Sequence, residues 1–211
     1  SRLPRHDVQA LWGDWKTHLF LALTLCNLVP LWAVTYLPGL DLPNHTLAAL
    51  LHTLPQTDIR VEYFQTQKLT SPYALFFILM TPMLKAFGYL TALKVVVSLA
   101  VVGIPMSALY FMRVFNPDNW EWAFVSFIFV YTFHFEYGFI SYVLGLPLVL
   151  CGLALFWRLT QDRLSIRLQI ASALVAALVY LSHVINIIAL CVGAGILIAT
   201  IIVDSRQGKT D

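Results

Sequence analysis

Two acidic residues and three histidines lie beside long apolar stretches of the sequence, where ionisable side chains are costly. Asp41 directly follows the first apolar run, and Glu136 lies in a short turn between two later runs. His45, His134 and His183 occupy similar places. Two carboxylates with imidazoles nearby can activate an incoming hydroxyl group as a general base or hold a divalent cation. The sequence therefore predicts a polar site in which Asp41 and Glu136 are catalytic and the histidines bind substrate.

The same residues also suit structural roles. Asp41 precedes Pro43 at the position of a helix N-cap, where a carboxylate accepts hydrogen bonds from free backbone N–H groups. Glu136 and the histidines would then lie at the level of the lipid headgroups, where water hydrates them. The sequence alone leaves both interpretations open.

The composition indicates the environment of the chain. Of 211 residues, 59% are hydrophobic and only 11% are charged, whereas soluble domains carry roughly a quarter of charged residues. The formal net charge is only +2 and the basic residues are dispersed, which argues against nucleic-acid binding. We therefore expect an all-α, polytopic membrane protein whose partners are membrane lipids.

The long apolar runs predict six membrane crossings. His18 to Leu37 has the length of one crossing, with a kink expected at Pro30. Leu168 to Val203 would form a helix of ~52 Å at 1.5 Å per residue, so a break is expected at Ser182-His183. We expect one transmembrane domain over residues 1–211, either alone or as part of a longer protein. Its predicted crossings are residues 18–37, 90–112, 120–134, 139–157 and the two parts of 168–203.

The first outer loop is predicted over residues 38–71. A stripe of leucines after Asp41 follows helical spacing, while His45 and His52 point the opposite way. This pattern is typical of an amphipathic helix that lies parallel to the membrane. Residues 55–70 are polar and are expected to contain a short helix. The leucines of the stripe are Leu47, Leu50, Leu51 and Leu54.

Charge placement decides how residues 72–112 are divided. The stretch is longer than one crossing and is expected to break near Gly88. If residues 72–87 do not cross, the basic loop from Arg158 to Arg167 lies inside, in agreement with the positive-inside rule. We therefore expect a cytoplasmic N-terminus, with Asp41, Glu136 and His183 together on the outer side.

Aromatic residues cluster around Glu136. They suit the lining of a lipid or sugar groove, although an interfacial aromatic belt would have the same composition. Tyr137 is accordingly a further candidate for substrate binding. The cluster consists of Phe133, Phe135, Tyr137, Phe139 and Tyr142.

The order of these features resembles the N-terminal core of the GT-C superfamily, the multispan glycosyltransferases that use polyprenyl-phosphate sugars. In that family a first span leads into an outer loop that begins with a catalytic acid and contains membrane-parallel helices. Leu40-Asp41-Leu-Pro-Asn-His45 occupies that place here, and Glu136 in Phe133-His-Phe-Glu-Tyr-Gly138 matches the second outer acid. The resemblance implies sugar transfer from a polyprenyl-phosphate donor at the outer face of a bacterial plasma membrane. It leaves a requirement for a divalent cation undecided.

Two other classes of protein remain as alternatives. A transporter or channel would line a polar path with Glu136, His134 and His183. A non-catalytic membrane partner would need Asp41 and Glu136 only for stability or assembly.

Overall fold

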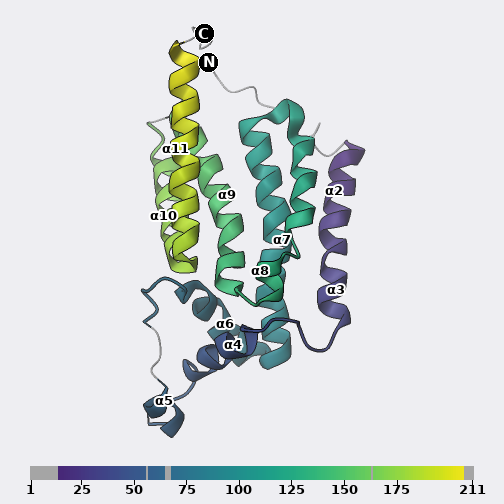
Figure 1. The fold of residues 1–211 in the computed structure, drawn as a ribbon, viewed down its shortest axis with the longest axis vertical. Coiled ribbons are helices and arrows are strands. Elements are labelled where there is room, and N and C mark those ends of the chain that lie inside the picture. The colour runs from purple at the N-terminus through teal and green to yellow at the C-terminus, as the bar shows by residue number, and fades with distance from the viewer. Residues whose placement is uncertain (1–13, 56, 65–67, 163, 207–211) are drawn as a thin grey trace.

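The computed structural model describes residues 14–55, 57–64, 68–162 and 164–206. Within these ranges the chain is helical and contains no strand, which confirms the all-α prediction. The segments α2–α3, α7, η1, α9, α10 and α11 run along the long axis of the molecule (Figure 1). The elements α4, α5 and α6 gather at one end, which we call the lower end after its place in the figure. The bounds are α2 Trp15–Cys26, α3 Leu28–Ala33, α4 Leu42–Leu51, α5 Ile59–Tyr63, α6 Ala74–Phe87, α7 Tyr89–Phe115, η1 Pro117–Phe129, α8 Phe133–Glu136, α9 Ile140–Gln161, α10 Ile166–Ser182 and α11 Val184–Arg206.

Three helices in the described part are long and apolar enough to cross a membrane. They are α7, α9 and the stretch Val184–Val203 of α11. The chain is therefore an integral membrane protein by the length and composition of its helices. The predicted breaks are also confirmed, because α6 ends before Gly88 and α10 ends before His183. Of the other predicted crossings, α10 is an apolar α-helix of 17 residues, whereas the first apolar run and residues 120–134 are not single α-helices.

The first apolar run was predicted to be one kinked helix from His18 to Leu37. In the structure it forms two short helices. The break lies at Asn27, between α2 and α3, and the second helix ends at Ala33. Pro30 explains this position, since it has no N–H to donate to the carbonyl four residues earlier, at Cys26. At the break itself, the Tyr131 hydroxyl donates a hydrogen bond to the Asn27 carbonyl at 2.5 Å.

The predicted crossing over residues 120–134 is a 3₁₀ helix, η1, rather than an α-helix. Its exposure repeats every third residue, with Trp122, Val125 and Ile128 exposed while Ala123 and Ser126 are buried. The segment is kinked at Asn119, whose φ of −124° and ψ of 37° are not helical, and a 3₁₀ helix rises about 2.0 Å per residue instead of about 1.5 Å in an α-helix. The greater rise lets the residues after the kink extend further along α7 than an α-helix of the same number of residues.

At the upper end, polar contacts join η1 to α2 and α7. Arg113 on α7 donates from Nη2 to the Thr17 hydroxyl at 2.9 Å, and its guanidinium lies 4.8 Å from the Trp120 ring centroid. The ammonium of Lys16 lies 2.7 Å from a carboxylate oxygen of Glu121. These contacts fix the entry of η1 against both helices.

The lower end contains the predicted outer loop and the segment after it. α4 and the short helix α5 confirm the two helices expected there. α6 has 14 residues and is about 21 Å long, too short for a bilayer core of about 30 Å. Its residues Ala74, Phe76 and Met80 are fully buried in the main core.

The buried side of α4 includes residues outside the leucine stripe. Leu42, Thr46 and Ala49 are buried together with Leu51 of the stripe, whereas Leu47 is 47% exposed. The His45 ring packs against Phe76 of α6, with 6.2 Å between the ring centroids. The His52 ring packs against Phe77, with 5.5 Å between the centroids. The histidine face is therefore turned toward the protein, because α6 offers it aromatic rings. That α4 lies parallel to a membrane stays a prediction.

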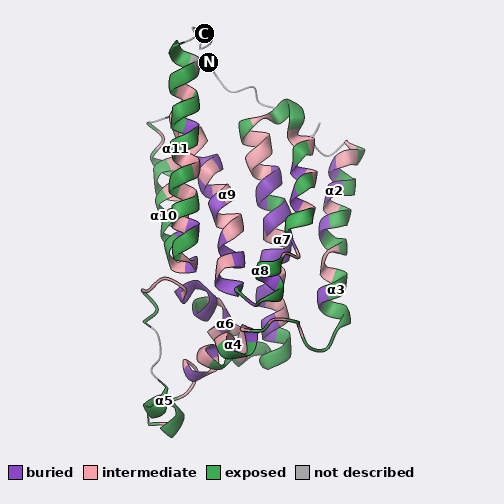
Figure 2. Ribbon diagram, in the orientation of Figure 1, coloured by how far each residue is buried: buried purple, intermediate pink, exposed green. Residues whose placement is uncertain are grey.

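The main core lies between α6, α7 and α9. Figure 2 shows buried residues concentrated on these helices, whereas α11 is largely exposed. Where α9 meets the junction of α10 and α11, Asn186 is fully buried and its amide nitrogen donates to the Tyr142 carbonyl and the Ser182 hydroxyl, both at 3.0 Å. A Cβ at Gly145 would lie 2.7 Å from Asn186 Cγ. Gly145 thus allows the polar side chains to reach α9.

Candidate functional site

The structure joins the two segments that carry the predicted catalytic residues. The backbone N–H of Asp41 donates to the carbonyl of Tyr137, the residue after Glu136, at 3.0 Å. Gly138 makes this approach possible, because its φ is +85° and a Cβ there would lie 2.7 Å from the Leu42 nitrogen. Residues almost a hundred positions apart in the sequence therefore meet at the lower end.

The carboxylate of Asp41 is not engaged as a helix cap. Asp41 occupies the N-cap position of α4, as the structural interpretation required, but its side chain makes no capping hydrogen bond. Glu136 is the last residue of α8 and is exposed. Neither carboxylate forms an ion pair with another residue in the described part of the chain. Both acids are therefore open to an added polar group.

Two of the predicted substrate-binding histidines belong to one row of rings. The His134 ring lies 4.9 Å from that of Tyr142, which in turn lies 5.7 Å from the His183 ring. His183 also meets Tyr73 edge to face at 4.5 Å. The row connects α8, α9, the α10–α11 junction and the start of α6.

Tyr137 and His45 lie outside this row. The Tyr137 ring packs 4.4 Å from Phe133 and 5.7 Å from Phe139, and Phe139 is 6.2 Å from His134. Tyr137 is thus linked to the row through Phe139. The His45 ring instead contacts Phe76, and the negative charge of Asp41, one helical turn earlier, acts to raise the pKa of His45. The predicted set is therefore gathered at the lower end, with His45 on the side of Asp41.

Hydrogen bonding assigns the tautomer of His183. Its Nδ1 accepts the backbone N–H of Ile185 at 3.1 Å, so the proton of the neutral ring is on Nε2. Burial lowers the pKa of His183 from its ordinary value of 6.5, which favours this neutral form. His183 can therefore donate one hydrogen bond from Nε2 at neutral pH.

Burial also lowers the pKa of His45 from 6.5, and the nearby charge of Asp41 opposes this shift only partly. The unfolded chain therefore binds a proton at His45 more readily than the folded protein. The contribution of neutral His45 to the free energy of unfolding is therefore complete above about pH 6.5, and it is expected to decrease as the pH falls below that value. The midpoint of thermal unfolding in detergent, measured from about pH 7.5 down to about pH 5.5, would show this loss of stability.

The His45→Gln variant is expected to lose part of the pH dependence, and adding His183→Gln should flatten it further, since the pKa of His183 is shifted the same way. Equal slopes in the wild type and the double variant would contradict the assignment. A steeper slope in either variant would contradict it as well.

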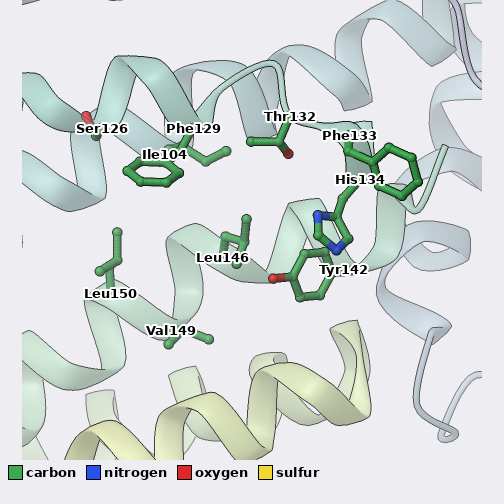
Figure 3. Close-up of a pocket in the computed structure, with 10 residues that line it drawn as sticks. All are labelled: Ile104, Ser126, Phe129, Thr132, Phe133, His134, Tyr142, Leu146, Val149 and Leu150. Atoms are coloured by element: carbon green, nitrogen blue, oxygen red, sulfur yellow. The ribbon is translucent and has the colours of Figure 1, made fainter. Parts of the chain in front are cut away.

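A groove of about 550 Å³ opens beside the row of rings. Figure 3 shows His134 and Tyr142 together at one end of it, with Ser126 and Leu150 at the other. The intervening lining is almost entirely apolar. We call this the α9 groove, and it is lined by Ile104, Ser126, Phe129, Thr132, Phe133, His134, Tyr142, Leu146, Val149 and Leu150. Its shape and lining suit an apolar chain with a polar group at the His134 end.

The sequence did not predict that Tyr73 contacts the candidate site. Its φ is +77°, a left-handed conformation that costs a non-glycine residue about 1 kcal/mol or more. The Tyr73 carbonyl accepts from the Ser141 hydroxyl at 3.5 Å, and its ring contacts His183. Only the position of Tyr73 before α6 could have drawn attention to it, because a backbone dihedral leaves no pattern in one sequence.

No group of three or more His, Cys, Asp or Glu side chains that could hold a metal ion occurs among the residues that the structure describes. Comparison of the chain with protein-family models, with curated proteins and with solved structures found no match.

Proposed function

We propose that the chain is a GT-C-like membrane glycosyltransferase that moves a sugar from a polyprenyl-phosphate donor to an acceptor at its lower end. The observation that carries this proposal is the 3.0 Å bond from Asp41 N to the Tyr137 carbonyl. It holds two acidic residues, neither in an ion pair among the described residues, at the end of the molecule where His134 and Tyr142 line the α9 groove. Asp41 is the general base, and Glu136 assists it.

The donor has two parts that match the α9 groove. An isoprenoid chain is apolar and would lie along Leu146, Val149 and Leu150. Its phosphate would lie near Tyr142 and His183, whose rings are 5.7 Å apart. The Tyr142 hydroxyl and the Nε2–H of His183 are hydrogen-bond donors suited to phosphate oxygens.

The reaction follows from these positions. Asp41 takes the proton of the acceptor hydroxyl as its oxygen bonds to the anomeric carbon of the sugar. The bond from that carbon to the phosphate oxygen breaks, and its electron pair leaves with the polyprenyl phosphate. Hydrogen bonds from Tyr142 and His183 stabilise the charge that develops there. Glu136 accepts a second hydrogen bond from the acceptor and orients it.

The proposal includes an orientation in a bacterial plasma membrane. The crossings would be α2–α3, α7, η1, α9, α10 and α11, with a cytoplasmic N-terminus and the lower end outside. Arg113, Arg158 and Arg167 then lie near the cytoplasmic ends of their segments, in agreement with the positive-inside rule. Single-cysteine labelling at Asn44 and Thr160 with an impermeant thiol reagent would test the sidedness.

The Asp41→Asn variant is expected to lose sugar transfer by about 100-fold or more, since general-base catalysis contributes about 10²–10⁴-fold. Proteoliposomes would carry a panel of radiolabelled polyprenyl-phosphate mannose, glucose and arabinose, with water as the acceptor. The measured quantity is free sugar released above that of empty liposomes.

Asp58→Asn is the matched control. Asp58 is in the same loop, but a hydrogen bond and ion pair with Arg60, 2.8 Å from its carboxylate, hold its pKa at about 2. Asp58 is thus an aspartate of the same loop whose carboxylate is already paired with a basic side chain. Unchanged release in Asp41→Asn, or no release from any donor of the panel by the wild type, would overturn the proposal. A polar-path transporter or a non-catalytic partner would then be favoured.

A further inference from the structure

A second groove lies on the opposite side of α7 from the main core, against α3. It has a volume of about 440 Å³, which is in the range of ligand sites. Most of its lining comes from one α7 face with helical spacing. We call it the α3–α7 groove, and it is lined by Leu28, Trp32, Val95, Ser98, Leu99, Val102 and Gly103.

Lys94 lies at the lower end of this groove. It is five residues into α7, about 7.5 Å from the start of the helix, which is the level at which lysines meet lipid headgroups. Its ammonium donates to the Val34 carbonyl and lies 5.6 Å from the centroid of the Trp32 ring. An ammonium has three protons, and this bond uses one.

Lys94 has no carboxylate within ion-pair distance among the described residues, where the ion pairs are Lys16–Glu121 and Arg60–Asp58. A cation at this depth without a counter-ion favours an anionic ligand. The side chains around it are fixed, because Trp32 Nε1 donates to the Ser98 hydroxyl at 3.1 Å, and that hydroxyl donates to the Lys94 carbonyl at 2.7 Å. The Lys94 ammonium therefore lies beside groove residues whose side chains are already held in place by hydrogen bonds.

The remainder of the groove excludes a polar occupant. Leu28, Val95, Leu99 and Val102 offer no hydrogen-bonding side chain. An extended peptide in this position would leave its backbone groups unpaired in an apolar environment, which costs several kcal/mol per group. An acyl chain has no such groups. The charge and the lining together suit a ligand with an anionic head and a hydrocarbon tail.

We propose that this site binds an anionic membrane phospholipid, with its phosphodiester at Lys94 and one acyl chain in the α3–α7 groove. The site is separate from the α9 groove and does not depend on sugar transfer. The bound lipid would add to the contacts between α3 and α7, which near this point include the hydrogen bonds of Lys94 and Trp32.

Native mass spectrometry of the detergent-purified protein, titrated with phosphatidylglycerol or phosphatidylcholine, tests the proposal. The wild type is expected to retain one phosphatidylglycerol in preference to phosphatidylcholine. Lys94→Gln should bind phosphatidylglycerol about fivefold more weakly, as expected for one basic residue at a lipid surface. Lys94→Arg should retain the binding, because it keeps the charge.

Lys85→Gln is the matched control, since Lys85 is an exposed lysine near the same end of α7 that does not line the groove. It should bind phosphatidylglycerol as the wild type does. Leu99→Trp, at a side chain that is 51% exposed, fills the groove without removing buried packing and should also weaken binding. Equal retention of the two lipids, or full binding by Lys94→Gln or Leu99→Trp, would overturn the proposal.

Discussion

Replacing Gly145 with alanine is expected to destabilise the protein by about 2–6 kcal/mol, from overpacking of about 1–3 and an unpaired buried amide of about 1–3 kcal/mol. The added methyl group would overlap the Asn186 amide and the Ser182 hydroxyl. Because Asn186 is fully buried, its side chain has nowhere to move without losing its bonds to Tyr142 and Ser182. The α10–α11 pair would then separate from α9.

Thermal unfolding in detergent, followed by circular dichroism, would measure the effect. Gly195→Ala provides the control, because Gly195 is on α11 and a Cβ there would meet nothing within 4 Å. This control should be as stable as the wild type or slightly more, since alanine favours a helix over glycine by up to about 1 kcal/mol. Similar behaviour of the two variants would show that the contact at Gly145 is not the cause.

Replacing Gly138 with alanine is expected to cost about 2–4 kcal/mol and to impair the proposed sugar transfer. A φ of +85° strains any L-residue by about 1–2 kcal/mol. In addition, the new Cβ would lie 2.7 Å from the Leu42 nitrogen, a backbone atom that cannot rotate away. Relief requires the turn to move from Asp41, which breaks the bond to the Tyr137 carbonyl.

Gly88→Ala separates the two parts of this effect. Gly88 has a φ of +73°, but a Cβ there would meet nothing within 4 Å, so only the dihedral strain applies. Its ψ of 178° places it in a region that is almost restricted to glycine, so alanine there should cost about 1–3 kcal/mol but leave the proposed transfer unchanged. If Gly138→Ala kept the proposed transfer as Gly88→Ala is expected to, the close approach of the two acidic segments would be unimportant for the site.

Much of the helical framework could be predicted from the sequence. The bounds of α7 and α9 follow from apolar runs of sufficient length, and Gly88 and His183 interrupt runs that are too long for one helix. The position of the first break could not be placed at Asn27, because a proline disrupts the helix upstream of itself by an amount that depends on the local contacts. Here Tyr131 takes up the Asn27 carbonyl.

The candidate site was predictable in its residue types but not in its contacts. The sequence indicates acids and histidines beside membrane segments, but the bond between Asp41 and Tyr137 depends on the tertiary packing around Gly138. The contact of the His45 ring with Phe76 could not be predicted, because the leucine stripe describes the faces of α4 alone and not the element that packs against it. Single-sequence patterns describe one helix at a time and miss such partners.

The 3₁₀ helix η1 bears on the order in which the chain assembles during biosynthesis. Long 3₁₀ helices have poor hydrogen-bond geometry and are uncommon without external support. The Pro117–Phe129 segment is held by α7 along its length and by Lys16 and Arg113 at its start. The 3₁₀ form of this segment is therefore expected to become stable only after α7 has formed. Because η1 directly follows α7 in the chain and packs against it, the two are expected to fold as one hairpin.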